Sequence, residues 1–234
     1  FALFYIIGFF LAKHDEDLMG QMLGAGGDGY IEDTKDRIRS GNPFGIYEGG
    51  SSVAVWLGIM VNNILVALRD FASGIAFGLP ALYNMGKFGV MVGSFDQLFA
   101  MHGLGGSFWL VVFAHGTLEI TGFVFIGAAG LILGKSFLFP GTIKRIDALK
   151  QGAKDGAKIM IGLLPVFAVA AFFEGFVTRL YNNEGLTFTI NGYNFPWFTA
   201  LVVLLSTIFV IGYFVVYPYR LGKRFAEQLK EEEV

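Results

Sequence analysis

The chain has 234 residues, of which 54% are hydrophobic, with 26 Phe, 33 Gly and no Cys. Its mean hydropathy of +0.59 lies far above the range of soluble domains and indicates a protein that crosses a membrane several times. The formal net charge of −2 argues against a basic nucleic-acid-binding protein, and the sequence has no Walker, dinucleotide-binding or zinc-finger motif. The lack of cysteine excludes disulfide bonds and thiol chemistry.

The first two segments differ sharply in polarity. Residues 1–12 are apolar and have no basic residue before them, so we expect the outer part of a first spanning helix whose beginning is missing, rather than a signal peptide. Residues 13–51 are acidic and rich in glycine and cannot span a membrane, which predicts an extracytoplasmic segment. Within it, residues 33–39 mix both charge signs at helical spacing and predict a short surface helix.

Two long apolar stretches follow, and only one charged pair separates them. Residues 52–69 predict the second span and residues 71–100 the third, with a tight turn at Arg69-Asp70. Pro80 is expected to kink the third span because it removes one backbone donor.

The next part of the chain alternates between apolar and basic character. Residues 108–133 predict the fourth span and residues 159–180 the fifth. Between them, residues 135–158 carry six Lys and Arg with apolar residues interleaved at helical spacing. This pattern predicts a basic amphipathic helix on the cytoplasmic surface, lying on anionic lipid or serving as a docking surface for a partner.

The last part of the chain predicts a hairpin, a span and a tail. Residues 181–197 alternate Thr, Phe and Ile around an Asn-Gly pair and predict a small hairpin. Residues 198–217 predict the last span, and residues 220–234 a basic, helical tail. The fold class is therefore an all-α polytopic bundle of about six spans. Because Lys and Arg are retained on the cytoplasmic side, both termini are expected to be cytoplasmic.

Polar residues inside the predicted spans converge on one depth. At about 1.5 Å of rise per residue, they fall in the outer half of the membrane. Since each would be unsatisfied in lipid at a cost of several kcal/mol, a single shared, inward-facing cluster is the favourable arrangement. The converging residues are Asn62, Asn63, Tyr83, Asn84, His115, Glu119 and Glu174.

Four roles are open for this cluster. It is an interhelical hydrogen-bond network that fixes helix register, a divalent metal site of His115, Glu119 and Glu174, a proton or ion relay, or a binding site for a lipid head group or a partner segment. No HExxH motif supports catalytic zinc, so no cofactor is expected and a divalent metal is the alternative. Three pairs of glycines four residues apart predict close helix packing: Gly74 and Gly78, Gly89 and Gly93, and Gly130 and Gly134.

Several spaced motifs together resemble the stage II sporulation protein M family of membrane proteins. They are Asn62-Asn63-x3-Ala67-x3-Phe71-Ala72-x-Gly74-Ile75-x2-Gly78, then Tyr83 with Gly89-x3-Gly93, His115-Gly116-x-Leu118-Glu119, and Ala170-Ala171-x2-Glu174-Gly175-Phe176-x-Thr178. The resemblance adds Thr178 to the candidate cluster. The chain departs from the family pattern at Phe88, where an Asn is expected, and at Ala114 and Arg179, where Pro is usual.

The resemblance implies a multi-pass protein of the inner membrane of bacteria or archaea, without established enzymatic activity for most members. In spore formers, the founding member works with cell-wall hydrolases, and some relatives are encoded beside AAA-type ATPases. The leading interpretation is a non-enzymatic scaffold that contacts membrane lipids, forms a homo-oligomer and holds envelope proteins or an AAA-type ATPase. The alternatives are a transporter or channel component that uses Glu119 and Glu174 for protons or ions, and an intramembrane metal-dependent enzyme.

Overall fold

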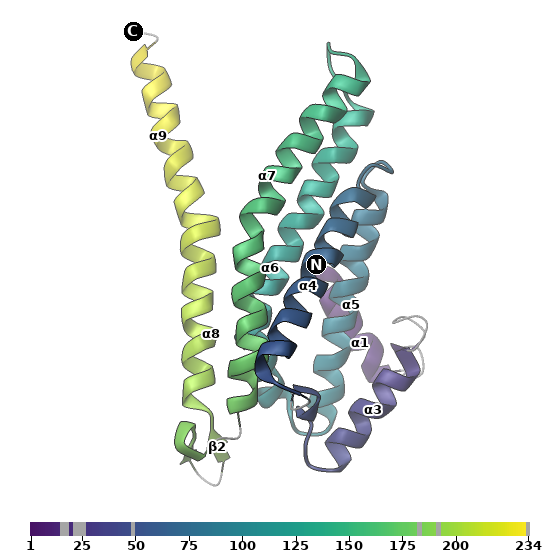
Figure 1. Ribbon diagram of the computed structural model, residues 1–234, viewed down its shortest axis with the longest axis vertical. Coiled ribbons are helices and arrows are strands. Elements are labelled where there is room, and N and C mark those ends of the chain that lie inside the picture. Colours follow the sequence, from purple (N-terminus) through teal and green to yellow (C-terminus); the bar gives the residue numbers. More distant parts are fainter. Residues whose placement is uncertain (15–18, 21–26, 48–49, 182–183, 191–192, 233–234) are drawn as a thin grey trace.

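A computed structural model describes residues 1–14, 19–20, 27–47, 50–181, 184–190 and 193–232 (Figure 1). Most of the chain is helical, which confirms the predicted all-α bundle. The α-helices are α1 (Ala2–His14), α3 (Gly27–Arg39), α4 (Ser52–Ser73), α5 (Leu79–Met101), α6 (Gly105–Leu138), α7 (Arg145–Phe172), α8 (Trp197–Val210) and α9 (Tyr217–Glu232). Two π-helical segments, η2 (Phe173–Val177) and η5 (Ile211–Val216), extend α7 and α8, and short 3-10 turns are η1 (Gly45–Tyr47), η3 (Thr178–Leu180) and η4 (Glu184–Leu186).

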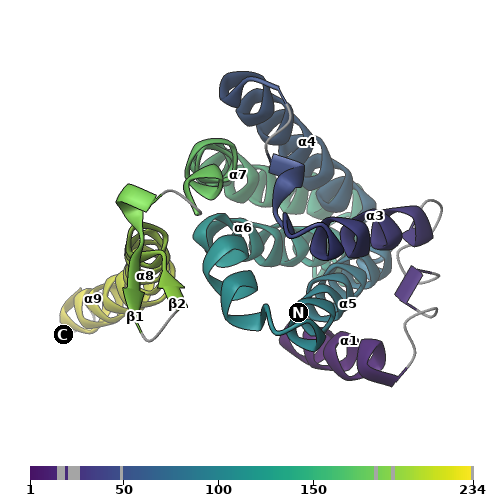
Figure 2. The same ribbon diagram turned by 90° about the horizontal axis from the view of Figure 1, so that it is seen from below.

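The helices α4 to α7 run side by side and form the centre of the molecule (Figure 1). On one side α1 packs along α5, and on the other α8 packs against α6. Seen from below, α3 lies across one end of the bundle, near α5 (Figure 2). Ile31 of α3 shares a buried cluster with Leu98 of α5, so α3 is part of the core at this end.

Within the residues that the structure describes, four helical stretches are long and apolar enough to cross a membrane. They are Ser52–Ser73, Gly105–Leu138, Arg145–Leu180 and Trp197–Phe225. The other two predicted spans correspond to α1, which is apolar but shorter, and to α5, which carries Lys87 and Asp96. The count of six spans stays a prediction.

The turn between the second and third predicted spans lies later than expected. α4 continues through Arg69 and Asp70 as far as Ser73, because a pair of charges does not interrupt backbone hydrogen bonding. The turn comes at the glycines that follow, and Gly78 has a φ of 77°. Pro80 stands in the first turn of α5, where its missing N–H needs no partner, so the predicted kink is wrong.

The basic segment is not a separate surface helix. α7 begins at Arg145 and continues without a break into the apolar stretch up to Phe172. Its first turns pack on α6 through glycine, since a Cβ at Gly152 would lie 2.0 Å from Ser136 Oγ. The predicted amphipathic helix is therefore the beginning of a span-length helix, held against α6 by close contact.

The C-terminal predictions agree with the structure. Strands β1 (Phe188–Ile190) and β2 (Tyr193–Phe195) pair antiparallel with Phe188 opposite Phe195, which confirms the hairpin. Beyond α8 and η5 the chain stays helical through α9, as the basic tail predicts.

Small residues bring the helices into backbone contact, as their spacing predicts. A Cβ at Gly93 would lie 2.0 Å from the Tyr5 carbonyl oxygen, and one at Gly8 would lie 2.2 Å from the Val90 carbonyl oxygen, so α1 and α5 touch through their backbones. A Cβ at Gly74 would lie 2.2 Å from the Gly130 carbonyl oxygen, which joins the end of α4 to α6. These contacts hold α4, α5 and α6 in fixed positions around the polar residues between them.

Candidate functional site

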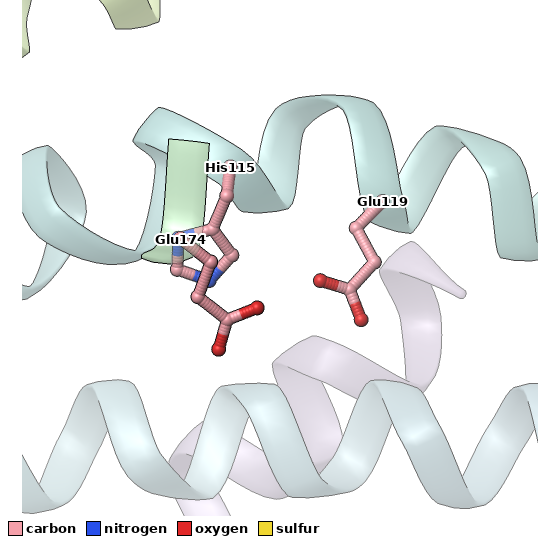
Figure 3. A group of neighbouring side chains, drawn as sticks. All are labelled: His115, Glu119 and Glu174. Atoms are coloured by element: carbon pink, nitrogen blue, oxygen red, sulfur yellow. The ribbon is translucent and has the colours of Figure 1, made fainter. Parts of the chain in front are cut away.

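Three ionisable side chains meet between α6 and the end of α7. His115 and Glu119 are one turn apart on the inward face of α6, and Glu174 projects from η2 (Figure 3). Their nitrogen and carboxylate oxygen atoms all lie within 4.8 Å of one another. His115 is only 5% exposed. We call these three residues the acidic cluster.

Glu174 reaches this position from a π-helical segment. The wider turn of η2 leads directly into Thr178, which is 2% exposed. The Thr178 hydroxyl lies 3.4 Å from His115 Nδ1 and also donates to the Phe173 carbonyl oxygen at 3.3 Å. π-Helical turns occur often at functional sites, where they change the direction of side chains within a helix. Here the segment directs Glu174 and Thr178 toward α6.

A cavity of about 190 Å³ opens from the acidic cluster toward α3. Its walls are largely aromatic and aliphatic, and its polar lining besides the cluster comes from α3. We call it the outer cavity, and its lining includes Phe44, Phe88, Met91, Phe95, Phe99, Phe108 and Val112 together with Tyr30, Thr34 and Arg37.

The three polar residues of α3 form a hydrogen-bonded series. Arg37 Nη2 donates to Thr34 Oγ1 at 2.8 Å, and Thr34 Oγ1 donates to the Tyr30 carbonyl oxygen at 2.8 Å. Arg37 Nε is buried and has no hydrogen-bond partner within the described residues. Burial raises the pKa of Tyr30, while the positive charge of Arg37 lowers it and the negative charge of Glu174 raises it. Tyr30 therefore lies in the fields of both charges.

A second cavity of about 370 Å³ lies on the other side of Glu119. We call it the inner cavity, because it extends toward the turn between α4 and α5. Its polar lining comprises Asn62, Asn63, Arg69, Asp70, Asn84 and Lys87, besides Glu119. Glu119, Phe88 and Met91 border both cavities. Glu119 is thus the ionisable side chain at the boundary between the two cavities.

The predicted polar residues separate into those at the cavities and one outside them. Asn63 is buried at 4% exposure, and its Nδ2 has no partner among the described residues, while its Oδ1 accepts a long contact of 3.5 Å from the exposed Asn62. Asn84 donates to Asp70 Oδ1 at 2.7 Å near the start of α5, rather than in the half that holds His115. Tyr83 is 69% exposed and points away from the cluster, so its predicted place there is wrong.

Sequence reasoning missed the contribution of α3 and a further buried carboxylate. Tyr30, Thr34 and Arg37 lie in a segment that has no apolar periodicity, so nothing in the local pattern connects them to a cavity between other helices. Asp96 is 3% exposed within α5 and accepts a hydrogen bond from the Tyr5 hydroxyl. Its presence inside the apolar stretch 71–100 was the available signal.

The acidic cluster has the chemistry to hold a cation. One imidazole nitrogen and two carboxylates are ligands that divalent metal ions accept, and the carboxylates alone can take up a proton. Within the described part of the chain, neither carboxylate receives a hydrogen bond or forms an ion pair. A bound cation would therefore supply the positive charge that these two side chains lack.

Comparison with known proteins agrees with the sequence motifs. A family model described as Stage II sporulation protein M matches residues 1–179, a range that includes the acidic cluster and the lining of both cavities. Searches of curated proteins and of solved structures returned no match.

Proposed function

From the premise that the chain belongs to the stage II sporulation protein M family of membrane proteins, we propose that it is a multi-pass component of the cytoplasmic membrane that conducts or couples cations through Glu119 and Glu174. The observation that carries the proposal is that Glu119 borders both the outer and the inner cavity. An ionisable side chain shared by two cavities that each hold polar groups is where a proton or ion would pass from one cavity to the other.

The residues along this route support an ionic role. From the acidic cluster to the turn after α4 the polar groups succeed one another: Glu174 and Glu119, then Asn63, then the hydrogen-bonded pair of Asn84 and Asp70. Ionisable groups inside a membrane bundle are costly and commonly mark ion pathways and proton relays. Phe88 and Met91 separate the cavities beside Glu119, so passage would depend on this one carboxylate.

The experiment is a flux assay on the purified full chain. Liposomes with a trapped pH-sensitive dye receive a membrane potential, and proton entry is followed in wild type, Glu119→Gln and Glu227→Gln. Glu227 is exposed on α9 and lines neither cavity, so its substitution is the matched control. We expect flux in the wild type and the control and none in Glu119→Gln. A wild-type rate equal to that of protein-free liposomes would contradict the proposal.

A second function, as a scaffold, has support from another part of the molecule. α9 continues beyond the bundle (Figure 1), and its side chains from Tyr217 to Phe225 are exposed. It combines Arg220, Lys223 and Arg224 with exposed Tyr219, Leu221 and Phe225. Such a helix offers a surface to a second copy of the chain or to a cytoplasmic partner such as an AAA-type ATPase, whereas α3 would face envelope proteins.

Light scattering on the purified chain tests the scaffold function. We expect a homo-oligomer that becomes a monomer when the chain ends at Tyr217, with the helical content of the rest retained. An unchanged mass after this truncation would contradict a role of α9 in self-association.

A further inference from the structure

Side chains of opposite charge line the outer cavity without forming an ion pair among the described residues. Arg37 lines the cavity from α3, and Glu119 and Glu174 line it from the bundle. Among the described residues, Arg37 has no ion pair, and its Nη2 is instead held by the Thr34 hydroxyl. Opposite charges in surroundings of low polarity attract strongly at short range, so their separation requires that the fold holds them apart.

The fold supplies that separation. Tyr30 of α3 packs edge-on against Phe95 of α5, with ring centroids 5.3 Å apart, and Ile31 packs on Leu98. Phe44, just after α3, stacks on Phe99 at 5.2 Å. These contacts fix α3 on α5 at one side of the cavity, while α6 and η2 hold the carboxylates at the other.

The geometry points to a ligand that carries both charges. We propose that the outer cavity binds a small zwitterion, a primary ammonium joined by a short carbon chain to a carboxylate or phosphate, with the ammonium at Glu119 and Glu174 and the anionic group at Arg37. A simple cation would leave the buried Arg37 Nε without an acceptor, and a simple anion would be repelled by the carboxylates. A simple cation or a simple anion would therefore compensate the charge at only one end of the cavity.

The size and lining of the cavity agree with this class of ligand. Its volume of about 190 Å³ leaves room for several water molecules, and therefore for a small ligand of amino-acid size. The aromatic walls between the two charged ends suit a short carbon chain. Two sources share this chemistry: a free metabolite and the ethanolamine head group of a membrane lipid.

The first experiment separates the two ends of the ligand. The full chain in nanodiscs of phosphatidylglycerol is titrated by calorimetry with ethanolamine phosphate, ethanolamine or inorganic phosphate. We expect ethanolamine phosphate to bind at least about tenfold more tightly than either partial ligand, because charged hydrogen bonds form at both ends. Equal affinity for the three probes would overturn the proposal.

Variants of α3 provide the matched comparison. Arg37→Gln should lower the affinity for ethanolamine phosphate to that for ethanolamine. Arg39→Gln, at an exposed position of the same helix, should leave the affinities for both compounds unchanged. Arg37→Lys keeps the charge and should lose less affinity than Arg37→Gln. If Arg37→Gln does not fold, Glu174→Gln tests the end of the cavity that binds the ammonium group. This variant should have a lower affinity for ethanolamine phosphate and for ethanolamine, but an unchanged affinity for inorganic phosphate. Unchanged affinity for ethanolamine phosphate in Arg37→Gln or in Glu174→Gln would overturn the proposal.

Native mass spectrometry distinguishes the two sources. In mixed nanodiscs, retention of phosphatidylethanolamine over phosphatidylglycerol that is lost in Arg37→Gln assigns the site to a lipid head group. Binding of ethanolamine phosphate without lipid retention assigns it to a free molecule.

The inference rests on the proposed function only in sharing Glu119 and Glu174, and the two can fail separately. Arg37→Gln should keep proton flux while losing zwitterion binding. Flux that depends on Glu119 without any zwitterion binding refutes this inference alone, and zwitterion binding without flux refutes the proposed function alone.

Discussion

The carboxylates of Glu119 and Glu174 come within 4.8 Å of each other from two different helical segments, α6 and η2. Two acidic groups this close repel each other when both are ionised, and surroundings of low polarity strengthen the repulsion. In the doubly ionised state this arrangement costs stability, as the arrangement of charges in binding sites commonly does.

Removing one of the two charges should stabilise the empty protein. Glu119→Gln keeps the shape of the side chain but relieves the repulsion, so we expect the unfolding temperature in detergent to rise by about 2–4 °C for each kcal/mol gained. Glu227→Gln should leave it unchanged. A fall for Glu119→Gln would mean that the carboxylates stabilise each other, for example through a shared proton.

Divalent cations should stabilise the wild type at the same site. Adding Mn²⁺ or Zn²⁺ should raise the unfolding temperature. At a free metal concentration one hundred times the dissociation constant, the free energy of unfolding should rise by about 2.7 kcal/mol. EDTA should reverse the effect, and His115→Ala should reduce it because one ligand is lost. The same rise in His115→Ala and Glu119→Gln would place metal binding elsewhere.

The contact between α1 and α5 should tolerate no side chain at Gly8. A Cβ there would lie 2.2 Å from the Val90 carbonyl oxygen, so Gly8→Leu must separate the two helices. We expect a loss of at least about 3 kcal/mol, measured as lower thermal stability. Gly58→Ala is the control, because its Cβ would meet no atom within 4 Å and alanine favours a helix. Equal stability of the two variants would show that α1 does not pack here.

The hydrogen bond between Tyr5 and Asp96 should contribute to the same interface. Tyr5→Phe removes the donor from a buried carboxylate, which should cost about 1–3 kcal/mol. Tyr219→Phe, at a 75% exposed position, should cost nothing measurable. If Tyr5→Phe matches this control in thermal stability, Asp96 does not depend on the tyrosine.

The absence of cysteine permits a direct test of orientation. Single cysteines at Asp36 of α3 and at Lys154 of α7 would be the only thiols in the chain. In intact cells, an impermeant maleimide should label the first and not the second, because the basic start of α7 is expected on the cytoplasmic side. Labelling of the cysteine at position 154 but not of the one at position 36 would show that the orientation in the membrane is opposite to the one proposed.

The sequence predicted the acidic cluster but not the cavity around it. Spacing placed His115 and Glu119 on one face, and counting residues from the span ends brought Glu174 to their level. Counting gives depth but not direction around a helix, which is why Tyr83 was placed inward although it points outward. The depth of Asn84 was wrong because the turn lies after Ser73, not at Arg69.

The part of the site that comes from α3 depends on tertiary contacts. Arg37 and Thr34 reach the outer cavity because Ile31 and Tyr30 dock on α5, and no local pattern encodes that docking. The helical class itself followed from composition and from the length of the apolar runs, since backbone polar groups inside a bilayer are satisfied only within helices or closed barrels.

The π-helical turn at Phe173–Val177 is, in effect, one extra residue accommodated within a helix. Deleting Phe176 would let the backbone close into a regular α-helix and turn everything after it by about 100°. Thr178 would then leave His115, and Tyr181 would lose the Ser107 hydroxyl to which it donates a hydrogen bond. A related chain that is one residue shorter at this point would keep a residue equivalent to Glu174 but lose the contacts of Thr178 and Tyr181 with α6. The number of residues in this turn therefore matters for a shared activity, as does the presence of the glutamate.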